Sequence, residues 1–148
     1  MAYGGGSDPI HGTMKVTGGT ATIGPVTGPG FIMGHDGTSN NVRLHAGGDV
    51  LPVGISAGDS ERDVDGTQLL TVGARVAFYP CVGVHMVRAK ASQTFTCGLP
   101  VYCFAGGLAT DSSDSSGQQL GIYLGAGVVT GSADGELIPV LCSGVGHI

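Results

Sequence analysis

The sequence predicts an all-β protein, a small glycine-rich β-barrel or β-sandwich with an extended N-terminal arm. Apolar residues recur at every second position in several short runs, which is the pattern of half-buried strands. Turn residues divide these runs at intervals typical of sandwiches and barrels. No window of helical length carries apolar residues at helical spacing together with capping residues, so helices are expected to be minor or absent.

Glycine is the most over-represented residue, with 29 copies in 148 residues, whereas about 7% is usual. A content of 41% hydrophobic residues argues against a disordered polymer, and no Gly-X-Y period indicates collagen. Residues 1–13 begin with small residues and are predicted to form a flexible N-terminal arm. Residues 14–148 are predicted to form a single β domain of ordinary size.

The first predicted strands lie on either side of the turn-rich segment 36–41. Phe31, Met33 and His35 alternate before this segment, and Val42 and Leu44 alternate after it, which predicts a hairpin. The clearest alternation follows at Leu70, Val72, Ala74, Val76 and Phe78. Pro80 is expected to end this strand or to mark an edge, because proline cannot donate to a ladder.

The C-terminal half continues the alternation. Val82, Val84 and Met86 repeat the period of two, which puts His85 on the opposite, exposed face of that strand. Phe95, Cys97, Leu99, Val101 and Cys103 predict a further strand. Residues 109–119 have no apolar period and are expected to form a mobile surface loop. The apolar runs 120–124 and 136–142 are predicted to pair across the turn 131–135.

The charge content bears on possible partners. Only 11% of residues are charged and the net charge is −5, which disfavours a nucleic-acid partner because phosphate binding needs clustered Lys and Arg. No apolar stretch reaches the length of a membrane span, and the N-terminus lacks the features of a signal peptide, so synthesis in a cytosol is expected. A surface with so few charges suggests that the chain binds copies of itself or a scaffold.

One segment matches a catalytic motif. Residues 54–58, Gly-Ile-Ser-Ala-Gly, fit the G-x-S-x-G nucleophile elbow, with Asp111 or Asp134 and His147 following in the required order. The elbow needs a helix after the serine, whereas residues 59–66 are polar and rich in turn residues. Two glycines around a serine arise readily by chance in such a glycine-rich chain. We therefore assign no catalytic residue and expect that the protein is not an enzyme.

Metal and cofactor sites are not expected. Residues 61–66 match the first positions of an EF-hand loop, but the twelfth position falls on Val72 and no flanking helices are predicted, so a solvated acidic loop is favoured over weak calcium binding. The five histidines lack ligand spacing. The four cysteines form no C-x-x-C pair, and buried thiols are favoured over a disulfide, and a disulfide over a metal site. They are Cys81, Cys97, Cys103 and Cys142.

The order of the segments resembles the capsid decoration, or cement, proteins of tailed bacteriophages. The resemblance spans roughly residues 40–142 and consists of small and apolar residues. The matching segments are Leu-Pro-Val-Gly-Ile-Ser-Ala-Gly at 51–58, Ala-Phe-Tyr-Pro-Cys-Val-Gly-Val at 77–84, Cys-Gly-Leu-Pro-Val-Tyr at 97–102, Leu-Gly-Ile at 120–122 and Glu-Leu-Ile-Pro-Val-Leu at 136–141. The four cysteines and the serine-rich segment near residues 110–117 depart from that pattern.

The resemblance implies a homotrimer that binds the major capsid protein on the outside of the virion and stabilises the shell. The N-terminal arm is expected to contact the capsid or a neighbouring subunit through Tyr3, Asp8, Pro9 and Ile10. An alternative is a host-surface or glycan-binding module of a phage tail or fibre. The absence of Trp and the 5% aromatic content disfavour this alternative because sugar sites usually present stacking aromatic rings.

Overall fold

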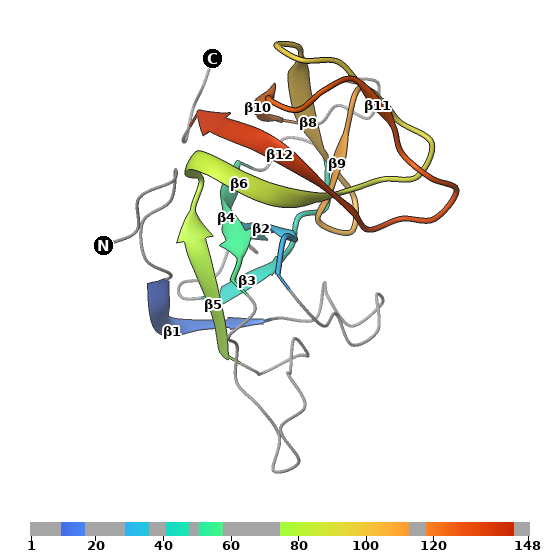
Figure 1. Ribbon diagram of the computed structural model, residues 1–148. Helices are drawn as coiled ribbons and strands as arrows, with labels where there is room; N and C mark the ends of the chain where they lie inside the picture. The colour runs from blue at the N-terminus through green and yellow to red at the C-terminus, as the bar shows by residue number, and fades with distance from the viewer. Residues whose placement is uncertain are drawn as a thin grey trace.

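The computed structural model describes residues 10–16, 29–35, 41–47, 51–57, 75–112 and 118–143. Within these ranges every regular element is a β-strand, so the all-β prediction is confirmed. The strands form two closed five-stranded barrels and one two-stranded sheet. The first barrel is built from the strands up to Pro80 and the second from strands that begin at Val82 (Figure 1).

The first barrel contains β1 to β5 in the order β1-β3-β2-β4-β5, and the pairing of β5 with β1 closes it. Its strands are β1 (Ile10–Val16), β2 (Ile32–His35), β3 (Asn41–Leu44), β4 (Pro52–Ser56) and β5 (Arg75–Pro80). The predicted hairpin is present as the antiparallel pair β2–β3, with His35 opposite Val42. The strand predicted from Leu70 is described only from Arg75 onward, and it ends at Pro80 as expected.

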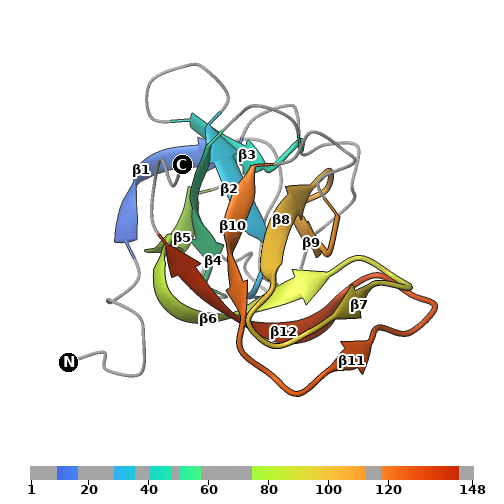
Figure 2. The same ribbon diagram turned by 90° about the horizontal axis from the view of Figure 1, so that it is seen from above.

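The second barrel has the order β10-β12-β6-β9-β8, and β8 pairs with β10 to close it. Its strands are β6 (Val82–Ala89), β8 (Pro100–Phe104), β9 (Leu108–Thr110), β10 (Gln119–Tyr123) and β12 (Glu136–Ser143). The predicted pairing of the last two apolar runs is confirmed, with Ile122 opposite Leu141. The short strands β7 (Thr94–Phe95) and β11 (Val128–Val129) pair beside this barrel (Figure 2).

Two predictions about the C-terminal half are wrong. The run from Phe95 to Cys103 is not one strand, because a turn with Gly98 at φ 84° separates β7 from β8. A left-handed φ of this kind interrupts an extended chain. The bounds of the surface loop predicted at 109–119 are wrong, since Ala109 and Thr110 are buried in β9 and Gln119 belongs to β10. Residues 113–117 lie outside the described residues.

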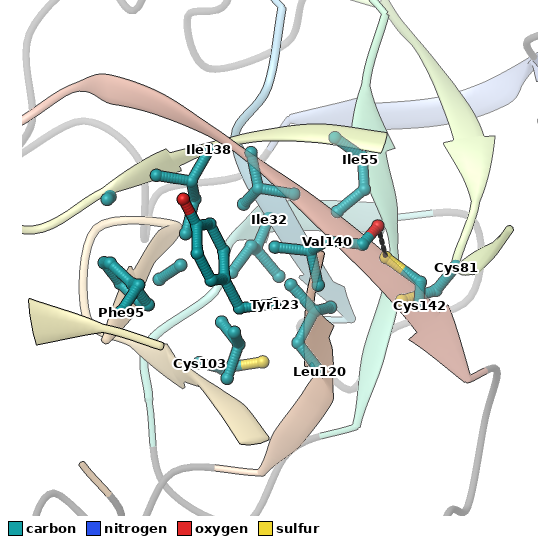
Figure 3. Close-up of a cluster of buried hydrophobic side chains, with 14 residues drawn as sticks. Ile32, Ile55, Cys81, Phe95, Cys103, Leu120, Tyr123, Ile138, Val140 and Cys142 are labelled. Atoms are coloured by element: carbon teal, nitrogen blue, oxygen red, sulfur yellow. Dashed lines mark hydrogen bonds between the residues drawn. The ribbon is translucent and has the colours of Figure 1, made fainter. Parts of the chain in front are cut away.

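The core consists of two clusters of buried apolar side chains. The larger cluster fills the second barrel and includes Ile32 and Ile55 from the first (Figure 3). The smaller cluster contains Met33, Val42, Leu44 and Phe78. The two barrels therefore share packed side chains.

Backbone contacts also join the barrels, at Gly107. Its N–H donates to the His45 carbonyl at 3.0 Å, and its carbonyl accepts from Ile32 N–H at 2.8 Å. Its φ is +70°, and a Cβ at this position would lie 2.7 Å from the Ile32 oxygen. Glycine is therefore required here both for the left-handed backbone conformation and for the close approach of the two backbone segments.

Candidate interaction surface

The longest pair among the described strands presents an apolar face to solvent. Strands β6 and β12 pair along their whole length, from Glu136 opposite Ala89 to Ser143 opposite Val82. They lie side by side in both views of the molecule (Figures 1 and 2). Five large apolar side chains of this pair are between 36% and 50% exposed. They are Val82, Val84, Met86, Leu137 and Leu141, here called the outer apolar face.

The register explains why these side chains share one face. Val84 lies opposite Leu141, and Met86 lies opposite Pro139. Directly opposed residues of an antiparallel pair project to the same side of the sheet. On β10, Ile122 also lies opposite Leu141, so the apolar row continues from β6 across β12 to β10. The face is thus a continuous surface of three adjacent strands.

The other side of the same two strands faces the core. In β6 the inward positions are His85, Val87 and Ala89, and in β12 they are Ile138, Val140 and Cys142, all of them buried. The sequence prediction for His85 is therefore wrong. His85 is only 7% exposed, its Nε2 donates to the Val82 carbonyl at 2.7 Å, and its ring centroid lies 5.3 Å from that of Tyr79. The buried ring therefore has a hydrogen-bond acceptor for its Nε2–H and an aromatic neighbour.

Arg88 is the only charged residue at the outward positions of β6 and β12. Glu136 lies opposite Ala89 at the same end of the pair, where it is the exposed first residue of β12. Arg88 Nε donates to the Pro29 carbonyl at 2.8 Å, and Nη1 donates to the Gly135 carbonyl at 3.3 Å. Its guanidinium carbon also lies 4.9 Å from the centroid of the Phe31 ring. Glu136 Oε2 accepts from Gly131 N–H at 2.9 Å. The rest of the outer apolar face therefore carries no charge.

An exposed apolar face of this kind needs an explanation. Single exposed apolar side chains are common, but contiguous apolar patches generally mark interaction sites. Each described barrel closes on itself, so its strands leave no barrel edge for strand addition. Association through this part of the molecule would therefore use side chains that project from the sheet.

The predicted arm residues do not lie on this face within the described structure. Tyr3, Asp8 and Pro9 lie outside the described residues. Ile10 is the first residue of β1 and lies opposite Phe78 in β5, so the first barrel begins before the boundary predicted at Met14.

The residues of the catalytic motif have structural partners in this fold. Ser56, the last residue of β4, is 1% exposed, and its Oγ accepts from Phe31 N–H at 2.9 Å. Asp111 Oδ2 accepts from Thr94 N–H and Asp134 Oδ1 from Ala91 N–H, each at 2.7 Å. His147 lies outside the described residues. The serine of the motif therefore lies buried at the end of a strand, where its hydroxyl is hydrogen-bonded to the backbone of Phe31.

Among the described residues, no group of three or more His, Cys, Asp or Glu side chains is arranged to hold a metal ion. The acidic segment 59–66 lies outside the described residues. Cys81, Cys103 and Cys142 are buried free thiols, as the sequence suggested. Cys97 is exposed, contrary to the expectation that all four are buried, because it lies in the turn between β7 and β8.

No helix among the described residues is long and apolar enough to cross a bilayer. The chain matches no protein-family model, and no curated protein is significantly similar to it. The family resemblance seen in the sequence therefore remains a prediction.

The sequence-based reading missed the outer apolar face because it assigned Val82, Val84 and Met86 to the interior. A signal was present in β12, where Leu137 to Cys142 is a continuous apolar run and not an alternating one. Such a run is apolar on both faces of the strand. A strand of this type is either buried on both sides or exposes apolar side chains on one side.

Proposed function

We propose that this protein is a virion structural protein that binds the outside of a tailed-phage capsid as a decoration or cement protein and stabilises the shell. The observation that carries the proposal is the outer apolar face, which lies on the closed second barrel and has charge only at one end. The segment order that resembles the decoration proteins supports the same function. The partner in this proposal is the major capsid protein.

The chemistry of the face indicates what the partner surface must provide. Val84, Met86 and Leu141 offer apolar contact area and no hydrogen-bonding groups, so the capsid side is expected to be apolar and shape-complementary. The net charge of −5 disfavours binding to packaged DNA, which fits a position on the outer surface.

A homotrimer would make such contacts effective without a tight single contact. When one subunit of a trimer is bound, the other two bind at a raised effective concentration. A ligand that binds only the assembled shell stabilises that shell by mass action. The proposed mechanism of capsid stabilisation therefore needs no catalytic or cofactor chemistry.

The test is co-sedimentation of the purified protein with undecorated capsids of the same virus, followed by heating of the decorated particles. The protein is expected to co-sediment and to raise the temperature at which the shells break. In Met86→Glu a carboxylate replaces the most exposed side chain of the face, and capsid affinity is expected to fall at least about tenfold because a charge becomes buried without a partner.

Val129→Glu is the matched comparison, because Val129 is 67% exposed and lies on β11, outside the outer apolar face. Its capsid affinity is expected to equal that of the unmodified protein. Binding through an uncharged face should also persist at raised ionic strength. Absence of co-sedimentation would refute the function, whereas equal binding by both variants would refute the role of the face alone.

The N-terminal arm is tested by deleting residues 1–9, which leaves β1 intact because that strand begins at Ile10. If Tyr3, Asp8 and Pro9 contact the capsid or a neighbouring subunit, the shortened protein binds more weakly and protects shells less against heat. Unchanged binding and protection would remove the arm from the proposal without affecting the outer apolar face.

A further inference from the structure

Two of the buried cysteines lie next to each other at one end of the core. Cys81 occupies the bend between β5 and β6, and Cys142 is the last inward-facing residue of β12. In the β6–β12 ladder, Cys142 lies opposite Gly83, which follows Cys81 by two residues. Figure 3 shows the two side chains beside each other, apart from the aromatic end of the cluster at Phe95.

Both thiols are buried, and each affects the ionisation of the other. Each cysteine is only 3% exposed, and Cys142 Sγ donates to the Val140 carbonyl at 4.0 Å. A hydrogen bond with Cys142 lowers the pKa of the Cys81 thiol, and the same hydrogen bond together with burial raises the pKa of the Cys142 thiol. Of the two side chains, which lie beside each other in Figure 3, Cys81 is the more readily ionised.

The backbone near Cys81 differs from a regular ladder in a way that favours a bond. Diagonal partners on a regular antiparallel pair are about 7–8 Å apart, whereas disulfides span about 4.4–6.8 Å between Cα atoms. Cys81 precedes the first residue of β6, and Gly83 has φ 82°, so the chain bends at this point. The bend thus places the Cys81 side chain beside that of Cys142, which is the arrangement that a bond between them requires (Figure 3).

We propose that Cys81 and Cys142 form an intrachain disulfide when the folded protein meets a low-molecular-weight disulfide such as oxidised glutathione. In the first step local opening of the chain exposes one of the two cysteines, its thiolate attacks a sulfur of the oxidant, and glutathione thiolate leaves and takes up a proton. In the second step the other cysteine thiolate attacks the protein-bound sulfur of the mixed disulfide and releases a second glutathione. Two protein thiols are oxidised, and one glutathione disulfide is reduced to two thiols.

The bond would join the start of β6 to the end of β12, which are the two strands that carry the outer apolar face. It would close a loop of about sixty residues, and cross-links of long loops restrict the unfolded chain most strongly. A protein made in a reducing cytosol would acquire this bond after release from the cell. This last consequence rests on the proposed function, but the chemistry of the pair does not.

The experiment uses a Cys97→Ser variant, which removes the exposed thiol and prevents links between molecules. The folded variant is incubated with oxidised glutathione, the remaining thiols are alkylated in denaturant, and the protein is digested with trypsin and an endoproteinase specific for Asp and Glu. Cleavage after Arg75, Arg88 and Glu136 places Cys81 in peptide 76–88 and Cys142 in peptide 137–148. Cys103 remains in a separate peptide that ends at Asp111.

The expected product is a disulfide-linked pair of these two peptides that is present without reductant and disappears on treatment with dithiothreitol, while Cys103 is alkylated. Oxidation is also expected to raise the melting temperature by at least about 5 °C, reversibly. Adding Cys81→Ser or Cys142→Ser should abolish both the link and the shift.

A link that involves Cys103, or full alkylation of Cys81 and Cys142 after long incubation, would overturn the proposal. Since the mapping uses the folded Cys97→Ser chain, it stands even if the second substitutions impair folding. Capsid binding is not measured, so this result and the test of the proposed function can fail separately.

Discussion

Substitutions at two valines of β6, Val84 and Val87, test which face of this strand lies in the core. Val87 is 0% exposed and Val84 is 36% exposed, and both are β-branched residues in the same antiparallel ladder. Replacing valine by threonine keeps the shape and the strand preference while exchanging a methyl group for a hydroxyl. The two substitutions therefore differ mainly in whether the new hydroxyl reaches water.

Val87→Thr is expected to lower the free energy of unfolding by about 1–3 kcal/mol, because the hydroxyl enters an apolar cluster in which the backbone groups are already paired. A loss of ~2 kcal/mol corresponds to a fall of about 4–8 °C in melting temperature for a chain of this size. Val84→Thr is expected to change the free energy by less than about 0.5 kcal/mol, because its hydroxyl is hydrated.

Denaturant unfolding, followed by far-ultraviolet circular dichroism, measures both variants against the unmodified protein. The slope of the transition should be the same in all three, so that the midpoints report stability directly. If Val84→Thr is the more damaging variant, the inward and outward faces of β6 are reversed and the outer apolar face does not exist.

Three further measurements follow from individual contacts. Gly121→Ala should destabilise the protein by more than about 3 kcal/mol, because the new Cβ would collide with the backbone of β12. Gly127→Ala should be close to neutral in the same unfolding assay, because its Cβ would have no neighbouring atom closer than 3.9 Å. Thr130→Val should lower the free energy of unfolding by about 1–3 kcal/mol, because Thr130 is 4% exposed and its hydroxyl both donates to and accepts from backbone groups. A neutral result in thermal unfolding would show that these hydrogen bonds contribute little. In the folded protein at mildly alkaline pH, iodoacetamide should modify Cys97 and leave Cys103 unmodified, since burial raises the pKa of the Cys103 thiol. Mass spectrometry follows the modification of each cysteine, and similar rates at both would contradict the burial of Cys103.

Short-range patterns predicted much of the fold. The hairpin at β2–β3 was predictable because turn residues separate two alternating runs, and the pairing of β10 with β12 because two apolar runs flank a glycine-containing turn. Pro80 marked the end of β5 for a local reason, the missing N–H. These features depend on residues that are close together in the sequence.

Other features depend on contacts between distant residues and were not predictable. A break at Gly98 splits an apparently continuous alternation, and Ala109 is buried because β9 pairs with β6. The orientation of β6 is the clearest case. Both of its faces carry apolar residues, so local periodicity cannot choose between them, and the pairing of Val87 with Ile138 in the core decides the outcome.

The orientation of His85 follows from the same long-range choice and has a consequence for the surface. A polar ring enters the barrel because it can donate to the Val82 carbonyl, and Val84 and Met86, on either side of it, then project to solvent. Burying those two residues would bring the ring to the surface and lose Val87 and Ala89 from the core. The exposed apolar row is thus coupled to core packing through the two-residue period of one strand. A partner that covers this row gains apolar contact without any change in the register of β6. The face is therefore suited to association between preformed structures.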